Sequence, residues 1–542
     1  MNIIVDISIL YTITSLSFFT IVGYGDLLHS KLLRNSTREI FYIFFWGIIF
    51  LFIIQFFLYL IFKITFLSNF LIIILGILLF FKSRNKYKNE LKFFFILLAC
   101  LIVVLIISKT HEDFKHHHLQ TVSGIFNQKI SLGKGNLNPQ FIYTPTLAYV
   151  IAIFKFPKFE NNFFHVVPFL TYLSFLGYIY FNLKKTKNKN LKISFLISLI
   201  FCLITFKTLK NYGFDITAFF FGAICIFEYV KSKKYYSETL LFFVFACSIK
   251  ITTLFSLPFF AFIYLKDILK NYKLTFFKNR IFYSFIFILI CVIFASFLDN
   301  ACIIYFIKNS CLDYNQVSWA IDKNLIDEIS TQTELDTKGF FSQNLIIDKN
   351  LYLKNFNWVH YWLNNSSTYK VLNFILIYFG CIILVIFFNK VTIKKNFKIY
   401  ELILSLSGVI FWFLKLPTLR YGYLPIFSSF FFIHYLFINF NENRILKKKL
   451  IILISLIIIW IHNYNRISDE FNRADANYFK NFPWYYLPER IIKKRVVTGG
   501  VMFEHKDNLG AYPCWNIPWP CWEPPKDIIM SDKFFFTIYE IK

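Results

Sequence analysis

The chain has 542 residues, of which 57% are hydrophobic, and its mean hydropathy is +0.54. Soluble globular proteins contain about 45–50% apolar residues, so this composition excludes an ordinary soluble domain and predicts an integral membrane protein. A formal net charge of +27 would suggest nucleic-acid binding in a soluble chain. Here the basic residues fall in short clusters between apolar runs, as in the cytoplasmic loops of membrane proteins, and we expect no nucleic-acid partner.

Apolar runs long enough to cross a bilayer, which needs about 20 residues per helix, recur along the chain. The stretch 237–265 is too long for one helix and has basic residues at both ends, so it predicts two short tilted helices that turn near 249–252. The expected fold class is an all-α polytopic membrane protein with about fourteen transmembrane helices. The other predicted spans are 3–22, 40–62, 66–81, 93–108, 163–182, 193–208, 215–230, 281–299, 371–389, 400–416, 424–440 and 450–463.

Basic clusters predict which loops face the cytoplasm, because lysine and arginine are retained on that side of the membrane. Both termini are then non-cytoplasmic, and the first run is a retained helix since no cationic segment precedes it. The large outer loops cover 109–162 and 300–369. The chain divides into a transmembrane domain, 1–463, and a small non-cytoplasmic C-terminal appendage, 464–542. The basic clusters lie near 31–38, 82–88, 184–189, 390–398 and 444–449.

Four cysteines lie outside the apolar runs and form two closely spaced pairs, Cys302 with Cys311 and Cys514 with Cys521. Both pairs fall in segments that the charge rule places outside, where oxidising conditions favour disulfides. We therefore expect two disulfides, each of which closes a short loop and contributes about 2–3 kcal/mol to stability.

The densest polar cluster begins where the fourth predicted helix leaves the membrane. It contains Glu112, Asp113, His116, His117 and His118. Adjacent carboxylates and histidines at a membrane surface suit either proton abstraction or ligation of a divalent metal ion. For the metal, the candidate ligands are Asp113, His116 and His118. The start of an ordinary hydrophilic loop has the same composition. The cluster is therefore either a functional site or a polar loop without chemical function, and both interpretations stay open.

Cationic side chains at predicted outer helix ends are placed to meet a lipid phosphate. They are Lys207, Lys250 and Arg420, and Tyr421 follows the arginine. The planar guanidinium of arginine matches the geometry of a phosphate. A lysine at a helix end has an alternative role, because its long side chain can extend to the membrane–water interface without binding any ligand. Asp215 lies at the start of the predicted helix after Lys207. A carboxylate there either stabilises the positive end of the helix dipole or is a second acidic group in a substrate cavity.

An apolar stretch at 143–157, interrupted by Pro145 and Pro157, predicts a helix along the membrane surface. An outer-loop acid, a surface helix, a lysine in a short-helix hairpin and a late Arg-Tyr pair together resemble the GT-C superfamily of membrane glycosyltransferases, which use polyprenyl-phosphate sugars. The likeness covers about residues 90–440.

A narrower resemblance links the chain to a family of uncharacterised bacterial multi-spanning membrane proteins. It rests on the stretch from Asp113 to Gln120 and on the tail Cys514-Trp515-Asn516-Ile517-Pro518-Trp519-Pro520-Cys521. One departure is His117, which stands where a tyrosine would be expected before the histidine.

The GT-C resemblance implies transfer of a sugar, with inversion, from a polyprenyl-phosphate donor to a cell-envelope glycan or lipid acceptor. The reaction would occur on the non-cytoplasmic face of the bacterial inner (plasma) membrane. Asp113 would act as base, assisted by Glu112 or His118 directly or through a divalent metal ion. Substrate-binding residues would be Arg420, Tyr421, Lys250, Lys207, Asp215 and His117.

This mechanism has a geometric corollary. Asp113 and Arg420 should share one cavity, since a base and a leaving-group cation must both reach one anomeric carbon. Lys250 and His118 should lie nearby, with the stretch 143–157 as the rim.

Two other functions fit the same sequence. An outer-face polysaccharide polymerase or ligase would also use arginine and histidine near a lipid diphosphate, and the loop 300–369 would suit it. A lipid or solute transporter would have ionisable residues inside its helices, along the path of the substrate. The predicted helices contain very few such residues, which argues against this function.

The charge rule makes a topology prediction. A reporter that is active only outside the cytoplasm should be active when fused after Asn463 and inactive when fused at Lys189, because the nearest basic clusters hold those sites on opposite sides. Enzymatic activity of the two fusions measures this directly. The reverse pattern at both sites would move the whole candidate site to the cytoplasm.

Overall fold

The computed structural model describes residues 3–33, 38–106, 117–126, 128–155, 163–209, 214–231, 236–271, 280–340, 347–387, 391–393, 399–440, 457, 460–461, 464, 468, 492–497, 500–505, 519–520, 528–532 and 536–541. Most of the predicted span 450–463 lies outside them. So do five of the predicted site and disulfide residues, namely Glu112, Asp113, His116, Cys514 and Cys521.

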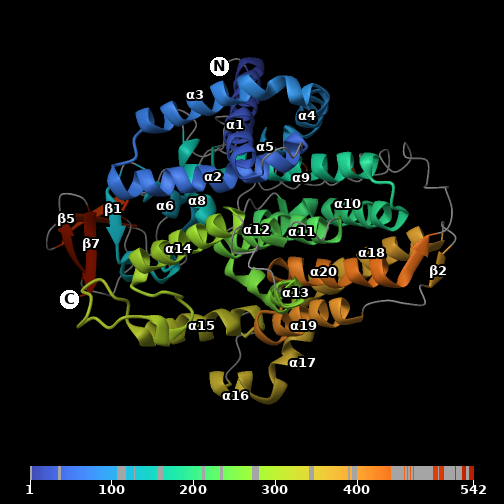
Figure 1. Ribbon diagram of the computed structural model, residues 1–542. Helices are drawn as coiled ribbons and strands as arrows, with labels where there is room; N and C mark the ends of the chain where they lie inside the picture. The colour runs from blue at the N-terminus through green and yellow to red at the C-terminus, as the bar shows by residue number, and fades with distance from the viewer. Residues whose placement is uncertain are drawn as a thin grey trace.

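Helices make up most of the described chain, as the apolar runs predict. In Figure 1 the labelled strands lie at two opposite sides of the molecule, with β1, β5 and β7 on the left and β2 on the right. The helices are α1 (Ile3–Leu32), α2 (Ile40–Ile61), α3 (Phe66–Ser83), α4 (Lys88–Leu101), α5 (Val103–Ile106), α6 (Leu119–Ser123), α7 (Lys134–Leu137), α8 (Thr146–Ile153), α9 (Phe163–Lys185), α10 (Lys189–Leu209), α11 (Phe214–Lys231), α12 (Tyr236–Ile249), α13 (Leu257–Asn271), α14 (Arg280–Asn300), α15 (Lys323–Thr337), α16 (Lys349–Leu353), α17 (Trp358–Leu363), α18 (Ser366–Phe387), α19 (Ile399–Lys415) and α20 (Leu419–Phe437). The strands are β1 (Ile130–Leu132), β2 (Val391–Ile393), β3 (Ile438–Phe440), β4 (Ile492–Val497), β5 (Gly500–His505), β6 (Ile528–Asp532) and β7 (Phe536–Ile541).

Within the described residues, five helices are long and apolar enough to cross a membrane. The third of them comprises α3 and α4, joined by a 3-10 turn. The expected all-α membrane class is therefore supported, while the total of about fourteen spans stays a prediction. The five are Ile4–Leu32, Ile40–Ile61, Phe66–Leu101, Phe163–Lys185 and Arg280–Asn300.

Close helix packing in the N-terminal part depends on glycine. A Cβ atom added to Gly47 of α2 would lie 1.8 Å from the carbonyl oxygen of Ile21 in α1, and one added to Gly25 of α1 would lie 2.1 Å from that of Ile43. Small residues let two backbones approach in this way, which is how membrane helices gain packing energy without a hydrophobic driving force. The surrounding core is built mainly of phenylalanine, isoleucine and tyrosine.

The stretch 237–265 breaks where the sequence predicts. Helix α12 ends at Ile249, a 3-10 helix η5 (Ile251–Ser256) follows, and α13 continues the chain. Lys250 at the break has an extended backbone, with φ −145° and ψ 115°. The interruption therefore presents a lysine between two helical segments, as expected.

The predicted surface helix at 143–157 is wrong in its position. Its helical part is α8, Thr146–Ile153, and every side chain of α8 is buried inside the protein, where α8 contacts α2, α6 and α9. A helix that is apolar all round belongs in a protein interior rather than at an interface, because it has no polar face for the headgroup side. The stretch 143–157 cannot form the exposed rim that was expected.

A small sheet joins the first outer loop to the end of the chain. The strand order is β1-β7-β6, with β1 parallel to β7 and β6 antiparallel to it. Asn136 adds a hydrogen bond from its side-chain amide to the carbonyl of Tyr539, 403 residues away, at 3.0 Å. The division into 1–463 and 464–542 stays a prediction, but the last strand is a structural part of the loop that contains residues 130–132.

A buried ion pair holds the same region to the end of α14. The Lys134 ammonium lies 2.7 Å from the Asp299 carboxylate, and the two side chains are only 4% and 2% exposed. The backbone N–H of Thr144 donates to the second oxygen of Asp299, at 2.9 Å, and the Lys134 ammonium donates to the Thr144 hydroxyl. These bonds satisfy both charges away from water, where each alone would be costly.

The pair also fixes the charge state of the lysine. Burial alone would lower the pKa of Lys134, but the Asp299 carboxylate outweighs burial and holds that pKa above its ordinary value. A group whose pKa rises on folding contributes stability that is present below its unfolded-state pKa and lost as pH rises through the folded value. The lysine therefore keeps its charge throughout the neutral range.

We expect Lys134→Ala to lower the free energy of unfolding by about 3–5 kcal/mol, because it leaves Asp299 buried without its partner. The control is Lys308→Ala, which breaks a pair with Asp327 whose side chains are 40% and 60% exposed and should cost at most about 1 kcal/mol. Denaturant unfolding in detergent measures both.

The double variant Lys134→Met/Asp299→Leu should recover most of the loss, since it removes both charges together. If Lys134→Ala costs no more than Lys308→Ala, the pair does not hold α14 to the outer loop.

Candidate functional site

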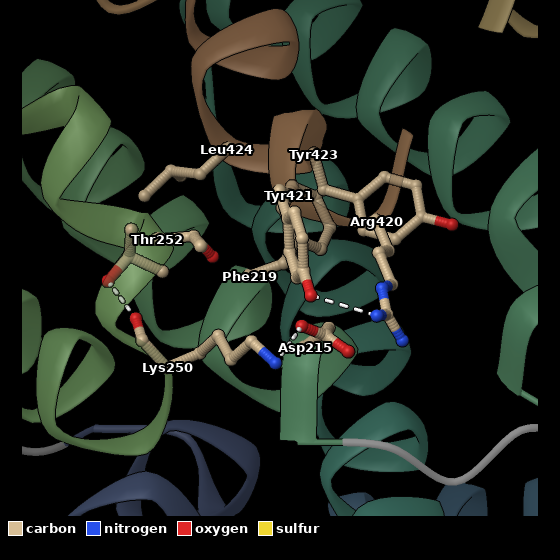
Figure 2. Close-up of a pocket in the computed structure, with 9 residues that line it drawn as sticks. Asp215, Phe219, Lys250, Thr252, Arg420, Tyr421, Tyr423 and Leu424 are labelled. Atoms are coloured by element: carbon tan, nitrogen blue, oxygen red, sulfur yellow. Dashed lines mark hydrogen bonds and ion pairs between the residues drawn. The ribbon is translucent and has the colours of Figure 1, made fainter. Parts of the chain in front are cut away.

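A small cavity gathers four of the residues that the sequence singles out, Asp215, Lys250, Arg420 and Tyr421. They come from three elements that are distant in sequence: the first turn of α11, the break between α12 and η5, and the first turn of α20. Figure 2 shows the Tyr421 side chain in the centre, with Arg420 on one side, Lys250 on the other and the Asp215 carboxylate below the Tyr421 hydroxyl. The grouping of these residues is an outcome of the fold.

Both cations approach the Tyr421 ring. The Lys250 Nζ lies 5.1 Å from the ring centroid and the Arg420 guanidinium carbon 4.7 Å from it. A guanidinium N–H of Arg420 donates to the Tyr421 hydroxyl at 2.8 Å, and the Lys250 ammonium lies 3.0 Å from Asp215. The tyrosine thus separates and orients two positive charges, using its negative ring face and its hydroxyl oxygen.

The field of the cavity favours an anion. Two cations face a single carboxylate, and the N-termini of α11 and α20 both meet the cavity, each with the partial positive charge of a helix start. Gly222 allows the two helices to approach, because a Cβ atom there would lie 2.5 Å from Leu424. Phosphate or another oxyanion is the ligand class that this charge arrangement suits.

Two tryptophans fix the turn that begins α20. Pro417 ends the preceding helix because it cannot continue the hydrogen-bond ladder. The Trp362 indole N–H then donates to the Pro417 carbonyl at 3.0 Å, and the Trp412 indole N–H donates to the Thr418 carbonyl at 2.8 Å. Arg420 therefore projects from a backbone held by α17 and α19, so its position does not depend on a loose loop.

His118 lies close to the site but not among the cavity residues. Its buried ring packs against Phe214, the neighbour of Asp215, with 4.5 Å between ring centroids. His117 packs against His118 at 4.3 Å. The structure thus places both histidines beside the start of α11, while their roles stay predictions.

The remaining predicted residues have different outcomes. Glu112, Asp113 and His116 lie outside the described residues. Lys207 belongs to α10, but its side chain is not described. Within the part of the chain that is described, no group of three His, Cys, Asp or Glu side chains forms a metal site. The predicted disulfide between Cys302 and Cys311 is confirmed, and the Cys514–Cys521 disulfide stays a prediction.

Tyr305, which follows α14, lies near the site, because it stacks on Tyr143, whose hydroxyl donates to the Ser248 carbonyl beside the break at Lys250. Burial raises the pKa of its phenol to about 12, and the nearby Lys250 ammonium partly offsets this effect. The phenol is therefore neutral at physiological pH and keeps its proton for donation. Sequence gave no reason to select Tyr305 among the chain's 33 tyrosines.

A second charged cluster lies where α2, α11 and α12 meet, and sequence reasoning missed it. Arg38 lies 3.0 Å from Glu228 and 4.0 Å from Glu238. Tyr42 donates to Glu238, while Tyr178 donates to Glu228 at 2.6 Å. Burial alone would lower the pKa of Arg38, but Tyr42 and the two glutamates outweigh it and raise that pKa. The sequence contains one indication of this cluster, because both glutamates lie near the ends of apolar runs.

The fold and the site define an α-helical membrane protein in which two cations, a tyrosine and a carboxylate gather at the N-terminal ends of two helices. Over residues 7–427 the chain matches the family described as Domain of unknown function (DUF8201), and it belongs to that family. No curated protein and no solved structure matches the chain.

The cavity makes a binding prediction. Arg420→Ala should weaken binding of a short-chain isoprenyl phosphate about 10–100-fold, since a hydrogen bond to a charged group contributes about 1.5–3 kcal/mol. Asp215→Asn should tighten binding, because it removes the only carboxylate among the cavity residues. Isothermal titration calorimetry in detergent measures both variants.

The matched control is Lys415→Ala, which removes a 66% exposed lysine paired with Glu334 at the end of α19, outside the cavity. It should leave affinity unchanged. Equal weakening by Lys415→Ala and Arg420→Ala would mean that only the general positive charge of this surface matters.

Proposed function

We propose that the protein transfers a sugar from a polyprenyl-phosphate donor to a cell-envelope glycan or lipid acceptor. The reaction takes place on the non-cytoplasmic face of a bacterial inner membrane and inverts the anomeric configuration, as in GT-C glycosyltransferases. The observation that carries the proposal is the convergence of Lys250 and Arg420 on Tyr421 at the meeting point of two helix N-termini.

This arrangement suits a departing lipid phosphate. Negative charge grows on the phosphate oxygens as the bond to the sugar breaks, and donors already fixed in place stabilise that charge without reorganising. Arg420 presents a planar fork to two phosphate oxygens, and Lys250 adds a point charge. Asp215 and Tyr421 hold the two cations in place, since Asp215 lies 3.0 Å from the lysine ammonium and the Tyr421 hydroxyl 2.8 Å from the guanidinium nitrogen.

The general base in this proposal is Asp113. Chain length supports its placement, because His118 is the fifth residue after Asp113, and a fully extended chain reaches at most about 3.6 Å per residue. Asp113 must therefore lie within about 18 Å of His118, whose ring packs beside the start of α11. Glu112 and His118 assist the base directly or through a divalent metal ion.

The decisive variant is Asp113→Asn, which keeps the size of the side chain and removes the base. It should lower transfer from a radiolabelled polyprenyl-phosphate sugar by about 10²–10⁴-fold while leaving donor binding unchanged. The control is Asp327→Asn, which alters a 60% exposed carboxylate of the outer loop and should keep full activity.

The same assay separates the competing functions. A transporter would move the labelled lipid across vesicles without consuming it, and a polymerase or ligase would consume a lipid diphosphate-linked glycan instead. Full transfer by Asp113→Asn would show that another group is the base.

A further inference from the structure

A disulfide-closed loop beside the cavity has an unusual surface. This apolar loop, residues 302–311, begins directly after α14 and is closed by the Cys302–Cys311 disulfide. Its tip carries four large apolar side chains that face outward, each more than a third exposed. They are Ile303 (52%), Ile304 (38%), Phe306 (43%) and Ile307 (43%).

The other side of the apolar loop is anchored to the protein. Tyr305 points inward and stacks on Tyr143, with 5.2 Å between ring centroids. The Lys308 ammonium lies 2.7 Å from Asp327 of α15. Because the disulfide and the tyrosine fix one side, the four apolar side chains cannot turn inward, and their exposure is a property of the fold.

The backbone of the apolar loop is largely satisfied by internal bonds. The N–H of Ile303 donates to the carbonyl of Ser310 at 3.1 Å, and that of Ile307 donates to the carbonyl of Ile304 at 2.9 Å. The Ser310 hydroxyl accepts from the Ile304 N–H and donates to the Ile304 carbonyl. Internal pairing of this kind is what a segment needs in order to enter a lipid environment without losing hydrogen bonds.

The exposed side chains continue a lipid-facing surface. Helix α14 is long and apolar enough to span the membrane, and its outward side carries Phe287 (42% exposed), Ile290 (57%) and Phe294 (43%). The apolar loop follows α14 after Asn300 with no intervening polar segment. A patch of this kind in water would favour aggregation, whereas acyl chains would cover it in the way that they cover α14.

We propose that the apolar loop inserts into the membrane leaflet next to the Lys250 cavity and is covered there by lipid acyl chains. The insertion sets the depth of the cavity, because Tyr305 on the inner side of the loop stacks on Tyr143, whose hydroxyl donates to the Ser248 carbonyl, two residues before Lys250. The cavity then opens at the level of the phosphate headgroups. This inference rests on the loop and α14 and does not require sugar transfer.

Photo-crosslinking tests the insertion. The photoreactive residue p-benzoylphenylalanine replaces Phe306 in one variant of the full chain, Phe294 of α14 in a second and Phe356 in a third. Phe356 is 59% exposed and follows α16, which lies far from α14 in Figure 1. Each protein is reconstituted in vesicles of palmitoyl-oleoyl phosphatidylethanolamine and phosphatidylglycerol, irradiated and analysed by mass spectrometry.

Lipid adducts should form at position 306 as often as at 294 and rarely at 356. A further variant, Cys302→Ser/Cys311→Ser, should reduce the yield at 306 and leave the yield at 294 unchanged, which also shows that the protein remains folded. Absence of lipid adducts at 306, adducts with a second protein chain there, or equal yields at all three positions would each overturn the proposal.

Discussion

A charge inside an apolar bundle must be paired, because desolvation of a single ion costs several kcal/mol and lipid offers no water to offset it. The described structure meets this constraint at helix ends. Lys134 and Asp299 neutralise each other where α14 ends, and Arg38 joins Glu228 and Glu238 where α2, α11 and α12 meet. These pairings connect segments that are far apart in sequence, so the need to satisfy charge also fixes the arrangement of the helices around the cavity.

Much of the helical pattern could be predicted, because the bilayer imposes a simple length and polarity rule on the chain. The run 40–62 corresponds to α2 at Ile40–Ile61, and the break in 237–265 occurs at Lys250. The stretch 143–157 was misplaced for a physical reason, since an apolar helix can be covered by lipid or by protein and hydropathy does not distinguish the two. The sheet could not be foreseen, because β1 has three residues and its partner lies near the C-terminus.

At the candidate site, the charged residues could be predicted from the sequence, but the side chains that contact them could not. Lys250 and Arg420 stood out because cations at helix ends are conspicuous in an apolar chain, and both reach one cavity. Tyr421 was selected as a neighbour of Arg420, yet its ring contacts both cations. Tyr305 and the Arg38 cluster were missed because their significance arises from contacts between segments that are distant in sequence, which periodicity and composition do not encode.

The sheet order β1-β7-β6 has a consequence for biosynthesis. The central strand, β7, leaves the ribosome about four hundred residues after its parallel partner β1. Pairing between such distant segments is slow because a long loop must close first. During synthesis, β1 therefore has an unpaired edge next to Asn136 until β7 has been made, and a chain that lacks β7 would keep that edge exposed.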